Sequence, residues 1–295
     1  MTLRGVFPPI PTPFLDDGID EAALAGNVKQ WMATKLSGIV ALGSNGEAPL
    51  VTEHESDAVI AAVRSAVPRG RLVIVGTGRE STAATITATR RAAELGADLV
   101  LVRTPSFFKN MMTSDAFVRH YTAVADAAPV PVLLYNVTMY TGVNLLPDAV
   151  ARLADHPNIV GMKESGGDIA QIADYVSRTP DRFSVLAGSA TTVFAALCVG
   201  AVGAVLALSA VLPDLCVELH QLVQQARYDE ARALQRRLAP LARLLGPTHG
   251  IAGLKYALDQ IGYRGGPPRA PLLPLSAEAA RQISEQLVAL SALTG

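Results

Sequence analysis

Short apolar runs recur along this chain and alternate with stretches whose apolar positions repeat every three or four residues. Eight runs are candidate strands, at residues 5–8, 38–43, 71–76, 97–103, 130–136, 158–163, 183–188 and 203–208. They start roughly 20 to 35 residues apart, the rhythm of alternating strands and helices with parallel neighbours. The runs are continuously hydrophobic, which is typical of parallel strands covered on both faces.

Local signals mark where the intervening helices begin and end. Thr52 and Glu55 form a capping-box pattern that predicts a helix to about residue 67. Ser81 can cap the next helix, and Pro147 and Pro213 suit the first turns of two later ones. Eight βα repeats in about 220 residues predict a (β/α)8 TIM barrel rather than an open sheet. No GxGxxG or GxxxxGK[ST] motif follows a strand, which weakens the open-sheet alternative.

The last quarter of the sequence reads as helices only. Patterns at 229–245, 250–262 and 276–293 predict three helices, the last two separated by a proline- and glycine-rich break. We therefore divide the chain into a barrel catalytic domain at 1–225 and a C-terminal helical appendage at 226–295.

Composition narrows the classes of function. Of 295 residues, 50% are hydrophobic and 17% charged, which supports a large core. The net charge of −1, without a basic cluster, argues against nucleic acid and anionic membranes as partners. The N-terminus lacks a signal-peptide pattern and no apolar run is long enough to span a bilayer, so we expect a cytoplasmic protein. Cys198 and Cys216 form neither a disulfide framework nor a metal-ligand spacing.

One lysine stands out by position. The chain has five lysines, and only Lys163 ends a strand that looks buried. Burial there disfavours the ammonium form, and a neutral amine at a pocket mouth can attack a ketone and form a Schiff base. Alternatively, Lys163 extends to solvent or pairs with Glu164. Position alone does not decide between these interpretations.

Other candidate site residues also follow strands, at the end of a barrel that carries catalytic groups. Ser44 and Asn45 lie between glycines in a loop that can hold a carboxylate or can be an ordinary capped turn. Tyr135 can transfer protons beside an amine or can be a packed aromatic. Gly188 allows a ligand to approach closely. Together with Lys163 they describe a site for a 2-oxo acid. Such a site needs no metal or cofactor, and the five histidines show no ligand spacing.

Four motifs in order then identify a resemblance that runs nearly end to end. They are Pro9–Phe14, Gly43–Glu47, Tyr135–Val137 with Thr141–Gly142, and Gly161–Ser165. The chain resembles the dihydrodipicolinate synthase / N-acetylneuraminate lyase family of class I pyruvate-dependent aldolases. Within the family, its nearest likeness is to 4-hydroxy-2-oxoglutarate aldolase.

The resemblance implies a carbon–carbon lyase that cleaves 4-hydroxy-2-oxoglutarate to pyruvate and glyoxylate. By family correspondence, Lys163 forms the imine and Tyr135 with Ser44 relays protons. Ser44 and Asn45 then hold the pyruvyl carboxylate. Gly188 and Val205 match positions that line the pyruvate pocket. The resemblance also implies a homotetramer built as a dimer of dimers.

Three departures from the family pattern bear on the second substrate. Synthases of dihydrodipicolinate carry an arginine that grips aspartate semialdehyde where this chain has Tyr140, and a phenol offers no bidentate, charged grip. Relatives have a tyrosine pair where this chain has Phe107 and Phe108, so the relay must end at Ser44, water or substrate. Thr138 replaces a proline. The alternatives are a 4-hydroxy-tetrahydrodipicolinate (dihydrodipicolinate) synthase, a sugar-acid aldolase or dehydratase, and a barrel that binds a 2-oxo acid without turnover.

Overall fold

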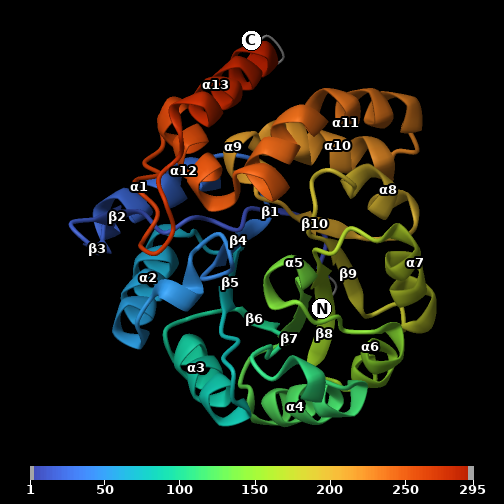
Figure 1. Cartoon of the computed structure of the whole chain (residues 1–295). Helices are drawn as coiled ribbons and strands as arrows, with labels where there is room; N and C mark the ends of the chain where they lie inside the picture. The colour runs from blue at the N-terminus through green and yellow to red at the C-terminus, as the bar shows by residue number, and fades with distance from the viewer. Residues whose placement is uncertain (1–2, 292–295) are drawn as a thin grey trace.

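The protein is built around a parallel eight-stranded sheet rolled into a barrel (Figure 1). The computed structural model describes residues 3–291. The strands are β1 (Gly5–Phe7), β4 (Gly38–Ala41), β5 (Leu72–Gly76), β6 (Leu99–Arg103), β7 (Val132–Asn136), β8 (Ile159–Glu164), β9 (Ser184–Ala187) and β10 (Gly203–Val205). Their spatial order is β1-β10-β9-β8-β7-β6-β5-β4, so each strand pairs with its neighbour in the βα series.

The barrel closes between β1 and β4 through a short bridge rather than a long ladder. Pro9 pairs with Val40 in parallel. The Val40 N–H donates to the Pro8 carbonyl at 3.0 Å, and the Ile10 N–H donates to the Val40 carbonyl at 2.9 Å. The eight predicted strands and the predicted (β/α)8 barrel are therefore confirmed.

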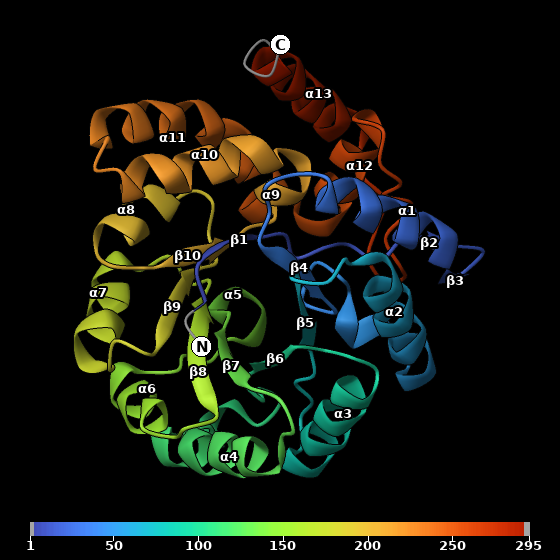
Figure 2. The ribbon, with the colours of Figure 1, turned by 180° about the vertical axis from the view of Figure 1, so that it is seen from behind.

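Helices surround the sheet on its outer face (Figures 1 and 2). The helices up to residue 224 are α1 (Glu21–Met32), α2 (Glu53–Ala66), α3 (Thr82–Glu94), α4 (Ser114–Ala127), α5 (Thr138–Thr141), α6 (Pro147–Ala154), α7 (Ile169–Arg178), α8 (Val193–Cys198), α9 (Leu208–Val211) and α10 (Pro213–Gln224). Two 3₁₀ turns, η1 (Ala48–Leu50) and η2 (Lys109–Met111), lie in loops that follow β4 and β6. A small hairpin of β2 (Phe14–Leu15) and β3 (Gly18–Ile19) precedes α1 and was not predicted.

The capping signals act as the sequence predicts. Thr52 and Glu55 form both hydrogen bonds of a capping box at the start of α2. The Ser81 side chain accepts from the Ala84 N–H at the start of α3. Pro147 and Pro213 occupy the first turns of α6 and α10, where a missing N–H costs nothing.

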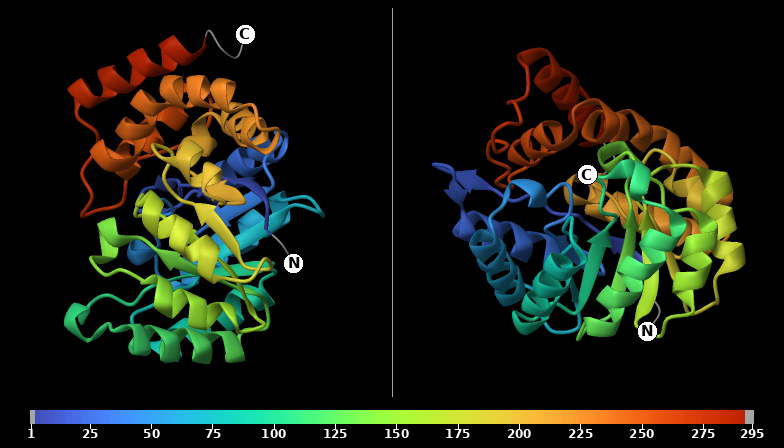
Figure 3. Two further views of the ribbon diagram at one scale, coloured as in Figure 1. Left: turned by 90° about the vertical axis from the view of Figure 1, so that its right-hand side faces the viewer. Right: turned by 60° about the horizontal axis from the view of Figure 1, so that its bottom comes forward.

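The C-terminal helices gather on one side of the barrel, with α13 outermost (Figure 3). They are α11 (Tyr228–Arg243), η3 (Leu244–Thr248), α12 (Gly250–Gln260) and α13 (Ala277–Ser291). The three predicted helices are confirmed, except that residues 292 and 293 of the last prediction lie outside the described residues. The segment η3 is a π-helical turn, which the sequence did not predict, and it contains Pro247. Proline has no N–H to continue an α-helical ladder, and π-turns are common at functional sites.

Two apolar layers hold the barrel. Alternate strand residues fill its interior, among them Phe7, Val40, Ile74, Leu101, Leu133 and Leu186. The other face of each strand packs against the helices in one continuous cluster. Between residues 3 and 291, none of the helices combines the length and the apolar character that crossing a membrane requires.

Candidate active site

Lys163 and Tyr135 lie side by side because β7 and β8 pair them in register. Lys163 is 4% exposed, and its Nζ donates to the Tyr135 hydroxyl at 3.3 Å. The same Nζ lies 4.3 Å from the centre of the Tyr135 ring. An amine and a phenol at this distance can exchange protons directly or through one water molecule.

Glu164 is not a partner of Lys163, because successive side chains of a strand point to opposite faces. Glu164 is 1% exposed and accepts a hydrogen bond from Asn136 Nδ2 at 2.7 Å, and another from the Gly166 N–H. Burial raises the pKa of its carboxyl, although these hydrogen bonds oppose the shift. The interpretation in which Lys163 pairs with Glu164 is therefore wrong.

Ser44 joins this pair from the loop after β4. Its Oγ lies 3.2 Å from the Tyr135 hydroxyl. Within residues 3–291, the backbone N–H groups of Ser44 and Asn45 donate no hydrogen bond, so both remain available to an anion. Asn45 Nδ2 is 3.5 Å from the Pro9 carbonyl, near the limit of a hydrogen bond. The loop thus offers two backbone donors, a hydroxyl and an amide to a carboxylate.

A cavity of about 100 Å³ contains all the candidate residues. It is lined by Lys163, Tyr135, Ser44, Asn45, Gly188 and Val205. Gly188 also leaves room for a neighbouring side chain, and its predicted closeness to a ligand stays a prediction. A Cβ there would lie 2.0 Å from Ser165 Oγ, so this glycine accommodates a neighbouring side chain.

Two parts of the cavity were missed by sequence reasoning. Ser165 lines the cavity, and its buried hydroxyl has no hydrogen-bond partner among residues 3–291. Ala242, Gly246 and Pro247, from the end of α11 and from η3, form another part of the wall. The motif Gly161–Ser165 contained Ser165, but nothing local in the sequence places the C-terminal helices over the site.

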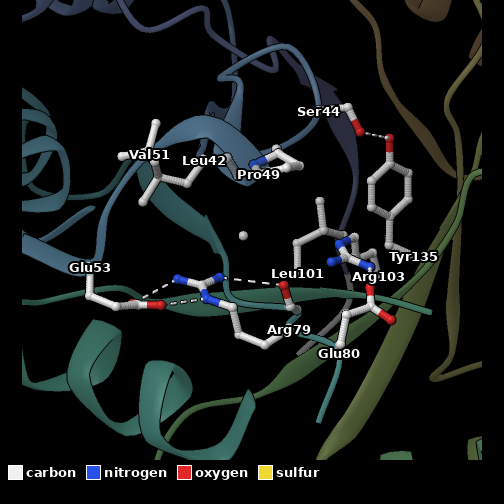
Figure 4. A pocket seen from close by; sticks show the side chains of 14 residues that line it. Leu42, Ser44, Pro49, Val51, Glu53, Arg79, Glu80, Leu101, Arg103 and Tyr135 are labelled. Atoms are coloured by element: carbon white, nitrogen blue, oxygen red, sulfur yellow. Dashed lines mark hydrogen bonds and ion pairs between the residues drawn. The ribbon is translucent and has the colours of Figure 1, made fainter. Parts of the chain in front are cut away.

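A second cavity, of about 300 Å³, shares Ser44 and Tyr135 with the cavity of Lys163 and is shown in Figure 4. Arg79 pairs with Glu53 at 2.8 Å at this cavity, and Arg103 pairs with Glu80 at 2.8 Å. These arginines are therefore already neutralised by carboxylates. Ser44 and Tyr135 line both cavities, and Figure 4 shows the hydrogen bond between their hydroxyls at the second one.

The residues that depart from the family pattern lie in the segments that follow β6 and β7. Tyr140 lines the cavity of Lys163, and burial raises the pKa of its phenol. Phe107 is 78% exposed, and its N–H donates to Glu80 at 2.9 Å. Phe108 is also exposed and packs edge-on against Phe107. Among residues 3–291, no arginine lines the cavity of Lys163, whereas Arg79 and Arg103 line the second cavity.

In the described part of the chain, no three His, Cys, Asp or Glu side chains come together as a metal site would require.

The chain is similar to a known family over nearly its whole length. A model of the dihydrodipicolinate synthetase family matches residues 2–290. A curated 4-hydroxy-tetrahydrodipicolinate synthase of Methanothrix thermoacetophila is 38% identical over 296 residues, which cover 99% of this chain and 98% of that protein.

Solved structures agree with the sequence match. Dihydrodipicolinate synthase from Thermotoga maritima has a TM-score of 0.94 at 32% identity and covers 98% of both chains. The chloride-inhibited dihydrodipicolinate synthase of Acinetobacter baumannii, solved with pyruvate, has a TM-score of 0.93 at 30% identity. That match covers 98% of this chain and 99% of the other.

Proposed function

The chain belongs to the dihydrodipicolinate synthetase family, and we therefore propose that it forms an imine between Lys163 and the carbonyl carbon of pyruvate. The protein is an enzyme of the pyruvate-dependent class I lyase type. The observation that carries the assignment of Lys163 is its contact with Tyr135: a buried amine 3.3 Å from a phenol, at the wall of a cavity.

The site supplies a group for each step of this chemistry. The Lys163 amine attacks the ketone, and the carbinolamine loses water to give the imine. Tyr135 gives and takes protons at the carbinolamine and at carbon 3, where loss of a proton gives the enamine. The enamine then attacks an aldehyde, or forms when the bond between carbons 3 and 4 of a hydroxy acid breaks. Ser44 and Asn45 hold the carboxylate of pyruvate throughout.

The outer end of the proton path differs from the family pattern. Phe107 has no transferable proton, so a tyrosine relay cannot continue there. Ser44 borders the second cavity, which is large enough for several water molecules. We propose that protons leave from Tyr135 through Ser44 to water in this cavity.

The relatives' names favour aspartate semialdehyde as the second substrate. The similar proteins are named 4-hydroxy-tetrahydrodipicolinate synthase, and their match spans the whole chain. Condensation of pyruvate with aspartate semialdehyde is therefore the first candidate for the complete reaction.

The lining of the cavity favours a second candidate, cleavage of 4-hydroxy-2-oxoglutarate to pyruvate and glyoxylate. Tyr140 stands where an arginine would grip the carboxylate of aspartate semialdehyde.

Steady-state kinetics with both substrates separates the candidates. The first predicts that kcat/KM for aspartate semialdehyde exceeds that for 4-hydroxy-2-oxoglutarate by about tenfold or more, and the second predicts the reverse. Tyr140→Arg, with Tyr140→Phe as its control, should raise kcat/KM for aspartate semialdehyde, because a guanidinium restores the bidentate grip. Activity with neither substrate would contradict both candidates but would leave imine formation open.

We also propose that the protein assembles as a homotetramer, a dimer of dimers. Phe107, Phe108 and Met111 are all more than 65% exposed in one loop. Exposed aromatic side chains that gather in one place mark contact surfaces. Light scattering measures the assembly, and Phe107→Asp should shift it toward smaller species.

A further inference from the structure

The chain contains a second buried lysine, Lys255 on α12, which the chemistry above does not use. It is 1% exposed, and its Nζ lies 2.5 Å from Glu47 Oε1. The same Nζ donates to the Pro267 carbonyl at 2.8 Å. Lys255 lines neither of the cavities beside Tyr135, so it cannot reach a substrate there.

The partner of Lys255 is the last residue of the loop that carries Ser44 and Asn45. Glu47 is 1% exposed and has a φ of 55°, a conformation that residues with a Cβ rarely adopt. Its other oxygen accepts the Arg269 N–H at 2.8 Å. One buried carboxylate thus joins this loop both to α12 and to the segment that follows α12.

Further contacts from Arg269 hold the residues that follow Glu47 in the chain. The Arg269 guanidinium donates to the Leu50 carbonyl at 3.0 Å and pairs with Glu55 at 2.6 Å. The Phe14 ring has Lys255 Nζ at 4.3 Å from its centre and the guanidinium carbon of Arg269 at 4.2 Å. Two cations and an aromatic ring therefore fix the region just after the loop.

A buried charged pair is directional, unlike an apolar contact. The Glu47 carboxylate has Lys255 Nζ at one oxygen and the Arg269 N–H at the other, so these two contacts specify the position of Glu47. The free N–H groups of Ser44 and Asn45 lie three and two residues before Glu47, respectively. A small displacement of Glu47 moves these donors relative to the carboxylate they would hold.

We propose that Lys255, acting through Glu47, is a positioning residue for the Ser44–Asn45 anion cradle. The C-terminal appendage, whose boundary after residue 225 is itself our proposal, then contributes to pyruvate affinity without touching pyruvate. This inference rests on the proposed function, because it takes the loop to be the site that binds the pyruvate carboxylate.

The test measures how much pyruvate is needed to form the Lys163 imine. Folded protein is incubated with increasing pyruvate, reduced with borohydride for a fixed time, and the adduct is quantified by mass spectrometry. Glu47→Gln and Lys255→Met should each raise the half-saturating pyruvate concentration about tenfold or more, because a displaced binding group loses its alignment. At saturating pyruvate the adduct should still form on Lys163.

The double variant Glu47→Gln/Lys255→Met separates positioning from simple destabilisation. It leaves no unpaired buried charge, so its Tm should recover toward that of the unaltered protein, and it can carry the test if Lys255→Met does not fold. If the ion pair positions the loop, half-saturation should stay raised in the double variant. Val124→Ala, in the buried face of α4 far from the loop, is the matched control: its Tm should fall while half-saturation stays unchanged.

A folded double variant or Glu47→Gln variant with half-saturation within about twofold of the unaltered protein would overturn the inference. Failure of the proposed function gives a different result, namely no Lys163 adduct in the unaltered protein at any pyruvate concentration.

Discussion

The two buried lysines of this protein have opposite surroundings. Lys163 is 4% exposed and Lys255 is 1% exposed, so burial alone does not distinguish them. Lys255 has a carboxylate at 2.5 Å and a carbonyl acceptor at 2.8 Å. Among the described residues, Lys163 has no carboxylate within 4 Å, and its one hydrogen-bond partner is the Tyr135 hydroxyl.

This difference shows what makes a buried amine reactive. The lone pair of an amine must be free of a proton before it can attack a carbon, and a nearby carboxylate holds that proton in place. Burial lowers the pKa of Lys255, but Glu47 acts in the opposite direction and favours the ammonium. Lys163 has the Tyr135 hydroxyl as its partner and lines a cavity. We therefore assign chemistry to Lys163 and structure to Lys255.

The largest expected effect is the loss of activity in Lys163→Met. Removing the nucleophile should lower kcat by about 10⁴-fold or more, measured as pyruvate-dependent turnover. Because no carboxylate is left unpaired, the free energy of unfolding should change by less than about 1 kcal/mol. A folded Lys163→Met protein that keeps its activity would end the assignment.

Lys255→Met tests the structural role that the comparison assigns to the second lysine. It leaves the buried Glu47 carboxylate without its cation and should lower the free energy of unfolding by about 3–5 kcal/mol, measured by urea denaturation. Arg281→Met removes the exposed pair with Glu278 and is the control, with an expected cost below about 1 kcal/mol. Equal losses in the two variants would mean that the buried pair is not structural.

Tyr135→Phe tests whether the Tyr135 hydroxyl, the hydrogen-bond partner of Lys163, transfers protons. The phenylalanine keeps the ring beside Lys163 Nζ but removes the hydroxyl, so kcat should fall by about 10²-fold to 10³-fold. Borohydride should still trap an adduct on Lys163, more slowly than in the unaltered protein. An unchanged kcat would show that the proton travels by another group.

The smallest expected effect concerns the ion pair of Glu55 with Arg269 at low pH. The hydrogen bonds from Arg269 lower the pKa of Glu55 from 4.5 to about 2, although burial opposes them. Because the folded-state pKa is depressed, this stabilisation is complete above pH 4.5 and is lost as the pH falls from there toward 2. Glu55→Gln should cost about 1 kcal/mol at pH 7 and should flatten the fall in Tm across that window. If the Tm of Glu55→Gln fell with pH as steeply as that of the unaltered protein, the stabilising role of the Glu55–Arg269 pair would be contradicted.

Much of the fold and the pairing at the site could be predicted from the sequence because the signals are local. A continuous apolar strand that ends in Lys163, and another that ends in Tyr135, place both residues at the same end of a parallel barrel. Adjacent strands then bring them together. The Ser44–Asn45 loop follows from the same rule.

The remaining features depend on contacts between distant parts of the chain. Glu47 and Lys255 are separated by 208 positions (255 minus 47), and no period or capping signal connects them. Lys255 reads from the sequence as one residue of a late helix. The π-turn η3 likewise gives no local sign that Gly246 and Pro247 will line the cavity of Lys163. These features appear only when the C-terminal helices are placed against the barrel.

The central claim is that only one of the two buried lysines is a nucleophile, and one experiment tests it directly. The protein is reduced with borohydride in the presence of pyruvate and then digested. The peptide that contains Lys163 and the peptide that contains Lys255 are both examined by mass spectrometry. We predict a pyruvyl adduct on the peptide that contains Lys163 and none on the peptide that contains Lys255. An adduct on Lys255, or a folded protein with no adduct on Lys163, would contradict the account.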